Sequence, residues 1–157
     1  MAELTHPYQH QPLRLYTFVH AYMSPIQHGI QTAHIVGDLL TMSAHTPRQR
    51  TQHQIAYDWA TDHKTIIVLN GGNSQSLLNI LDVLSTMSNA LSLPCVSFYE
   101  DGVSMELMRT AVGIVVPESI YTLSRLPRGD DDCGGDARLT PSTEAQLSDF
   151  LSTFRLA

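Results

Sequence analysis

Residues 13–45 have the sequence LRLYTFVHAYMSPIQHGIQTAHIVGDLLTMSAH, and this stretch decides the fold. Its first ten residues are rich in β-branched and aromatic side chains, which predicts a strand over 13–22. Ser24 is a favourable helix N-cap, and Pro25 suits the first helical position. The stretch therefore predicts a strand, a tight turn and a helix over about 25–44. The apolar positions that keep helical spacing are Ile26, Ile30, Ala33, Gly37 and Leu40.

The alternation of strands and helices continues along the chain. The further predicted elements are a helix at about 50–62, a strand at 64–69, a turn at 70–74, a helix at about 74–91, strands at 95–100 and 111–116, and a helix at about 142–154. Two strand–helix–strand units imply a largely parallel sheet, while the closeness of the last two strands allows a mixed one.

We therefore predict a single α/β domain over residues 1–157. Its four-stranded sheet is expected to be mostly parallel or mixed, with helices on both faces. A polar N-terminal arm is expected over 1–12 and an exposed loop, rich in Gly, Asp and Pro, over 123–141.

Charge limits the kinds of partner that the protein can bind. The net charge is −6; residues 1–128 hold nine acidic and seven basic side chains, and residues 129–157 hold six and two. The chain has one lysine, Lys64, and no basic stripe of the kind that proteins use to bind long nucleic acids. The composition disfavours tRNA as a partner, although a few arginines and backbone amides could still hold a compact phosphate ligand.

Other classes of protein are disfavoured by what the sequence lacks. No apolar run approaches the roughly 18 residues of a membrane span, and the N-terminus does not resemble a secretory signal, so we expect a soluble, cytoplasmic protein without membrane partners. Cys95 and Cys133 fit neither a disulfide framework nor a zinc site. Eight histidines fall within residues 1–63, but their spacing is not that of metal ligands. We predict no metal and no cofactor.

Two turns are candidates for a ligand site. Ligands of open α/β sheets bind where parallel strands end and helices begin. Here the candidates are the turn over 22–27, which contains Tyr22 and Ser24, and the Asn-Gly-Gly-Asn-Ser turn over 70–74. Asp101 directly follows an apolar strand, a common place for a functional carboxylate.

The chain resembles the type 2 peptidyl-tRNA hydrolases over about residues 14–120. In that family the first helix carries Ala-Gln-x-x-His-Ala, and in the matching stretch 24–35 Gln31 and His34 fall on the family's Gln and His. The segment 64–69, the helix after it, 96–101 and 110–114 match the later pattern in order and length. Asp101 falls on the active-site Asp of the family, and Thr110 on a Thr that precedes its last strand.

The resemblance implies the family's fold and a pocket for a nucleotide end. The position of the family's catalytic lysine is occupied by Gln27, which cannot stabilise a developing oxyanion by charge. We therefore expect a non-catalytic protein that sequesters a small nucleotide, such as a cyclic oligonucleotide signal. The residues expected to line the site are Tyr22, Ser24, Gln27, Gln31, Asp101, Ser104, Arg109 and Arg14, with Tyr99 as another base-stacking surface.

Within that set, Gln27, Gln31, Asp101 and Ser104 would contact base and sugar edges. Arg109 and Arg14 would contact phosphate, since a guanidinium fork suits it. Two alternatives stay open. One is an active peptidyl-tRNA hydrolase that uses Asp101 and Thr110, with His28 or an arginine in place of the lysine. The other is a protein-interaction module, or a homo-oligomer, that works through its apolar helices.

Overall fold

The computed structural model describes residues 5–102, 105–123 and 141–157, with only the backbone given for 101, 102 and 105–107. The strands are β1 (Leu13–Val19), β2 (Thr65–Asn70), β3 (Cys95–Gly102) and β4 (Met105–Pro117). They form one sheet in the order β2-β1-β4-β3, in which β1 is parallel to β2, and β4 is antiparallel to both β1 and β3. The prediction of an α/β fold with a four-stranded mixed sheet is confirmed.

Of the two predicted forms of the sheet, mostly parallel or mixed, the structure has the mixed one. β1, β2 and β3 run in one direction, as two strand–helix–strand units require. However, β4 turns back from β3 and inserts between β3 and β1, so two of the three pairings are antiparallel. The two strand–helix–strand connections remain, but one leads to the outer strand β2 and the other to the outer strand β3.

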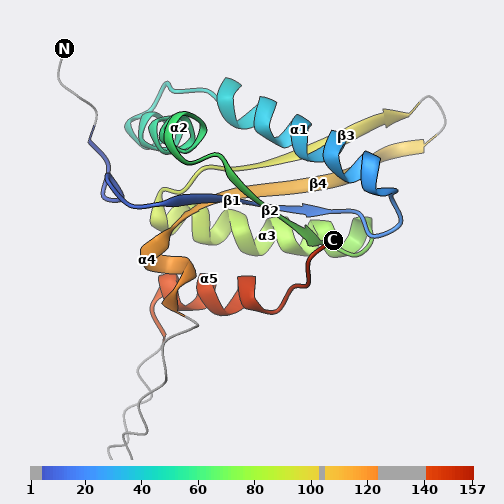
Figure 1. Cartoon of the computed structure of the whole chain (residues 1–157). Coiled ribbons are helices and arrows are strands. Elements are labelled where there is room, and N and C mark those ends of the chain that lie inside the picture. Colours follow the sequence, from blue (N-terminus) through green and yellow to red (C-terminus); the bar gives the residue numbers. More distant parts are fainter. Residues whose placement is uncertain (1–4, 103–104, 124–140) are drawn as a thin grey trace, which may run out of the picture.

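Helices cover both faces of the sheet, as predicted (Figure 1). One face carries α1 (Pro25–Thr41) and α2 (Pro47–Asp58), which continues into the π-helix η1 (Trp59–His63). The other face carries α3 (Ser74–Leu91), the short α4 (Glu118–Tyr121) and α5 (Thr143–Ser152). The predicted exposed loop over 123–141 lies almost entirely outside the described residues.

Local sequence explains where the helices begin. Ser24 accepts a hydrogen bond from the backbone N–H of Gln27, whose side chain accepts one from the N–H of Ser24. This capping box satisfies two N–H groups that no helical carbonyl reaches. α2 begins with the same arrangement at Thr46 and Gln49, with Pro47 between them, and therefore starts before the predicted residue 50.

The hydrophobic core lies on both sides of the two inner strands, β1 and β4. Leu15, Phe18 and Val19 of β1 are fully buried. Residues 111–116 of β4, which include Gly113, are also buried. At Gly113 an added Cβ would overlap the Cγ2 of Ile35 in α1. The absence of a side chain at this position lets α1 approach the sheet closely.

The apolar positions that define α1 in the sequence point to solvent in the structure. Ile26, Ile30 and Leu40 are 78%, 49% and 40% exposed. The residues that α1 buries against the sheet are Gln31, Thr32, Ile35 and Leu39. An apolar stripe on a helix ordinarily faces the core. Here the inward face is half polar, because it lies over the buried hydroxyl groups of Thr17 and Thr110 in the sheet.

We expect Gly113→Ala to destabilise the protein, since a β-branched side chain such as Ile35 has little freedom to move aside. Overpacking of this kind costs about 1–3 kcal/mol in the free energy of unfolding, which urea denaturation followed by circular dichroism would measure. Gly37→Ala is the control, because nothing lies within 4 Å of the added Cβ. Equal stability of the Gly113→Ala variant and the wild type would contradict the close approach of α1.

Candidate functional site

The carboxyl ends of β1, β2 and β3 meet at one edge of the sheet, together with the starts of α1, α3 and β4 (Figure 1). We call this the carboxyl edge. Backbone hydrogen bonds hold its segments side by side: Gly71 N–H to Val19 O at 2.8 Å, Ala21 N–H to Gly72 O at 2.7 Å, and His20 N–H to Thr110 O at 3.2 Å. The two turns predicted to bind a ligand are therefore neighbours.

The 70–74 turn is built for a close fit between β2 and α3. The Asn70 side chain accepts a hydrogen bond from the N–H of Gly72, which has φ +76°, a value that favours glycine. At Gly71 an added Cβ would collide with the Leu77 side chain and lie 3.0 Å from Val19 O. Asn73 then caps α3 by accepting from Ser76 N–H. Both glycines are explained by the turn itself.

Arg109, in β4, is the most unusual residue at the carboxyl edge. Its side chain is buried, at 5% exposure, and its Cζ lies 4.1 Å from the centroid of the Tyr99 ring. Nη2 donates to the Tyr99 hydroxyl, but Nε and Nη1 are buried with no partner among the described residues. Burial lowers the pKa of Arg109, against a smaller raising by Cys95. Among the described residues, the site thus holds a cation with two unpartnered donor nitrogens.

Arg109 faces the side of the sheet that α3 covers. Phe98 stacks on His34 of α1, with ring centroids 4.0 Å apart, so the next residue, Tyr99, and its cross-strand partner Arg109 point the other way. A β-bulge between Phe98 and Tyr99 leaves Thr110 as the extra residue on β4. Ser74, the first residue of α3, also has a buried hydroxyl without a described partner. These unpaired polar groups share one edge and one face.

The other predicted site residues lie on the α1 side. The Thr110 hydroxyl donates to Gln31 Oε1 at 2.7 Å, and both residues are buried. Ser24 and Gln27 are engaged in the capping box of α1. Tyr22 is 86% exposed, with its ring 5.6 Å from that of His20. The structure therefore brings Tyr22, Ser24, Gln27, Gln31, Arg109 and Thr110 to one edge, although on two faces.

Arg14, Asp101 and Ser104 were also predicted to line the site, but they are not among the side chains that the structure describes at the carboxyl edge. Arg14 lies near the start of β1, where it pairs with Thr65 and Val116 and places its Cζ 4.1 Å from the Tyr121 ring centroid. That position is about 17 Å from the end of β1, so Arg14 does not belong to a site at the carboxyl edge. The backbone of Asp101 lies at the end of β3, but its side chain, like the whole of Ser104, is outside the described residues.

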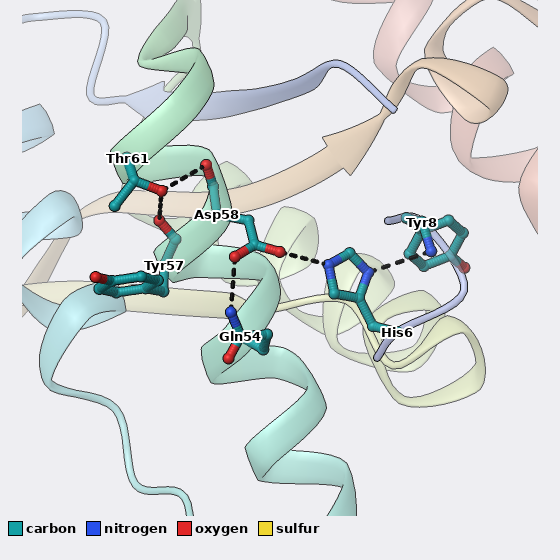
Figure 2. Close-up of polar contacts among 6 residues, drawn as sticks. All are labelled: His6, Tyr8, Gln54, Tyr57, Asp58 and Thr61. Carbon is teal, nitrogen blue, oxygen red and sulfur yellow. Dashed lines mark hydrogen bonds and ion pairs between the residues drawn. The ribbon is translucent and has the colours of Figure 1, made fainter. Parts of the chain in front are cut away.

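A second polar cluster, at the opposite edge, was not predicted (Figure 2). His6 Nδ1 accepts from the N–H of Tyr8 at 3.2 Å, so Nε2 carries the proton that it donates to Asp58 Oδ2 at 2.8 Å. The other carboxylate oxygen accepts from Gln54 at 2.7 Å. Sequence reasoning had no signal for this pair, because its members are 52 residues apart.

The His6–Asp58 pair borders an open cavity of about 400 Å³ that His10, Asp62 and His63 also line. Both ring nitrogens of His6 are occupied, so the pair has no free nitrogen for acid–base chemistry and instead fastens the N-terminal arm to the end of α2. Within the described residues, no three His, Cys, Asp or Glu side chains converge as a metal ion would require.

A second cavity, of about 450 Å³, lies between the end of α1, α2 and α3, and Cys95 is part of its wall. Burial raises the pKa of Cys95 to about 12, against a smaller lowering by Arg109. At neutral pH the group is therefore a thiol and not a nucleophilic thiolate. Neither cavity lies at the carboxyl edge, where Arg109 is covered by the Tyr99 ring.

No protein-family model matches the chain, and no curated protein matches it in sequence. The resemblance to type 2 peptidyl-tRNA hydrolases therefore stays a prediction. In the part of the chain that the structure describes, no helix is long and apolar enough to cross a membrane.

We expect Asp58→Ala to destabilise the protein, because it leaves the buried Nε2–H of His6 without an acceptor. Such a loss costs about 1–3 kcal/mol in the free energy of unfolding, measured by urea denaturation. Asp62→Ala is a matched control one turn further along, in η1, and as an exposed substitution it should change stability by at most about 0.5 kcal/mol. Equal effects of the two substitutions would show that the pair does not hold the arm.

Proposed function

We propose that the protein binds a small, phosphate-bearing nucleotide at the carboxyl edge and does not cleave it. The observation that carries the proposal is the buried guanidinium of Arg109, with Nε and Nη1 unpartnered among the described residues. A buried charge without a counter-charge is costly, and a hydrogen-bonded anion relieves that cost. A phosphate, with its several acceptor oxygens, suits the fork of an arginine.

The surroundings of Arg109 favour the same ligand class. The first turn of α3 presents backbone N–H groups and the positive end of a helix dipole, and the Ser74 hydroxyl there has no partner among the described residues. Backbone hydrogen bonds from Ala21 to Gly72 and from His20 to Thr110 put the backbone next to Arg109 about two strand spacings, or roughly 10 Å, from this turn. An arginine side chain on one side and a helix start on the other can thus approach one ligand together.

Tyr99 provides both a cover and a stacking surface. Its ring lies over the guanidinium and is 44% exposed, so a ligand phosphate reaches Nε and Nη1 only when this ring moves aside. The freed ring, or the exposed ring of Tyr22, can then stack on a nucleobase. The acidic chain, at net charge −6, favours a small nucleotide over a long polyanion.

Binding without cleavage is favoured by the groups around the turn. Gln27 occupies the position that the resemblance assigns to a catalytic lysine, and its side-chain oxygen is engaged with the Ser24 N–H. Lys64, the only lysine, precedes β2 and so lies at the opposite edge. The Thr110 hydroxyl is buried in its bond to Gln31. The protein would therefore act by holding its ligand away from other proteins.

A thermal-shift panel of mononucleotides, cyclic di- and trinucleotides, short oligonucleotides and a peptidyl-tRNA mimic tests the proposal. At 100 times its Kd a small nucleotide should stabilise the folded state by about 2.7 kcal/mol and raise Tm by roughly 5–10 °C. Arg109→Met should abolish the shift without lowering the Tm of the free protein, because it removes a buried charge that has no counter-charge among the described side chains.

Arg14→Met is the matched control, since Arg14 also places its Cζ 4.1 Å from a tyrosine ring but at the opposite edge. This variant should keep the full ligand shift. No shift with any small nucleotide, or an equal loss in the two variants, would contradict the proposed site. A shift with the peptidyl-tRNA mimic alone would favour the hydrolase.

Gln27→Lys tests whether the chain is a hydrolase that lacks its charged group. The new ammonium would stand at the start of α1, where the resemblance places the catalytic lysine. If the protein only binds nucleotides, neither the wild type nor the variant should release tRNA from a peptidyl-tRNA mimic above background. A gain of about 100-fold in the variant, the size typical of an oxyanion-stabilising group, would instead identify a hydrolase scaffold.

A further inference from the structure

The outer face of α1 is an apolar surface that no other described part of the chain covers. Five of its residues, Ile26, Ile30, Ala33, Gly37 and Leu40, follow one another at alternating spacings of four and three. The sixth, Gly29, lies four residues before Ala33 on the same face. All six are exposed, and they lie opposite the residues that α1 buries against the sheet. A helix face of this spacing is the kind that packs against another helix.

The outer face of α1 also has the shape for close helix packing. Gly29, Ala33 and Gly37 follow one another at every fourth residue, and nothing lies within 4 Å of a Cβ built at either glycine. Small residues in such a row allow two helix backbones to approach closely, while Ile26, Ile30 and Leu40 supply apolar area beside them.

We propose that the outer face of α1 binds the same face of a second copy of this chain, with the two helices antiparallel about a two-fold axis at Ala33. In that arrangement residues whose numbers add to 66 lie opposite each other. Gly29 then meets Gly37, Ala33 meets Ala33, and Ile26 meets Leu40. Large side chains meet large ones at the two ends, and the backbones approach at the small residues between them.

Charge and helix dipoles favour this occupant. Asp38 is the one Asp, Glu, Lys or Arg in α1, and it lies off the outer face, on the side toward the buried residues. Two copies can therefore meet there without like charges facing each other, although each chain has a net charge of −6. An antiparallel pair also sets the positive end of each helix dipole beside the negative end of the other, which a parallel pair does not.

The area of the outer face of α1 determines how tightly two copies are expected to bind. A helix of 17 residues is about 25 Å long and about 10 Å wide. Its face therefore covers a few hundred Å², below the roughly 800 Å² per partner of a standard stable interface. We expect a reversible dimer that forms as the concentration rises, and that salt strengthens, because salt screens the repulsion between two acidic chains.

Sedimentation equilibrium of the full chain, without nucleotide, tests this. The weight-average mass should rise from 17.4 kDa toward twice that value between about 1 and about 300 μM, the range expected of a small interface. Ala33→Glu should leave a monomer throughout. Ala90→Glu, the same change at an exposed position of α3, should dimerise like the wild type. A monomeric wild type, or equal behaviour of the two variants, would overturn the proposal.

Two further variants test the geometry. Gly37→Ala fills open space in the single chain, so it should raise the Tm of the monomer by about 2–4 °C while it weakens dimerisation about tenfold or more. A mixture of Gly29→Cys and Gly37→Cys chains of different mass, mildly oxidised, should form the mixed disulfide in preference to either homodimer. Predominant homodimers, or tighter dimerisation by Gly37→Ala, would rule out the antiparallel packing. The inference does not depend on nucleotide binding, which Ala33→Glu should leave unchanged.

Discussion

The insertion of β4 between β1 and β3 is the constraint on which the rest of the structure depends. Because β4 runs against its neighbours, it begins at the edge where β1, β2 and β3 end. This brings Arg109 and Thr110, from the start of β4, beside the turns that lead into α1 and α3. With parallel pairing throughout, residues at the start of a strand would lie at the far edge. The mixed sheet therefore lets β4 contribute a cation to an edge already occupied by two helix starts.

The predictable part of the fold is the part with local signals. α3 begins and ends at the predicted residues 74 and 91, since a polar N-cap precedes it and its apolar positions are regular. The capping residues Ser24 and Pro25 likewise mark the start of α1. In contrast, β4 is longer than predicted because its first residues are held by pairing with β3, and not by their own apolar pattern. η1 falls within the helix predicted at about 50–62, but its π form has no sequence signal, and α4 was not predicted.

The sequence predicts at which edge of the sheet the candidate site lies, but not on which face its side chains point. Strand direction and the two turns place Tyr22, Gln27 and Gln31 there, but the side to which a β4 residue points depends on the bulge beside Tyr99, which the sequence does not mark. Arg14 was assigned to the same ligand by its chemistry alone, and its register with Thr65 puts it at the other edge. The His6–Asp58 pair joins distant segments through tertiary contact, for which one sequence holds no signal.

The amphipathic pattern of α1 is inverted: polar residues face the sheet beside the candidate site, and the apolar residues face solvent. Gln31 and Thr32 are buried beside hydroxyl groups of the sheet and form hydrogen bonds with them. Gln31 accepts a hydrogen bond from the Thr110 hydroxyl, and Thr32 Oγ1 lies 3.4 Å from Thr17 Oγ1. Polar groups buried in this way require specific, directional contacts, so the inward face cannot also carry the full apolar stripe. The stripe is consequently turned outward, where water solvates it poorly. The same polar contacts that fix the helix over the carboxyl edge thus create the apolar surface that a second copy can cover.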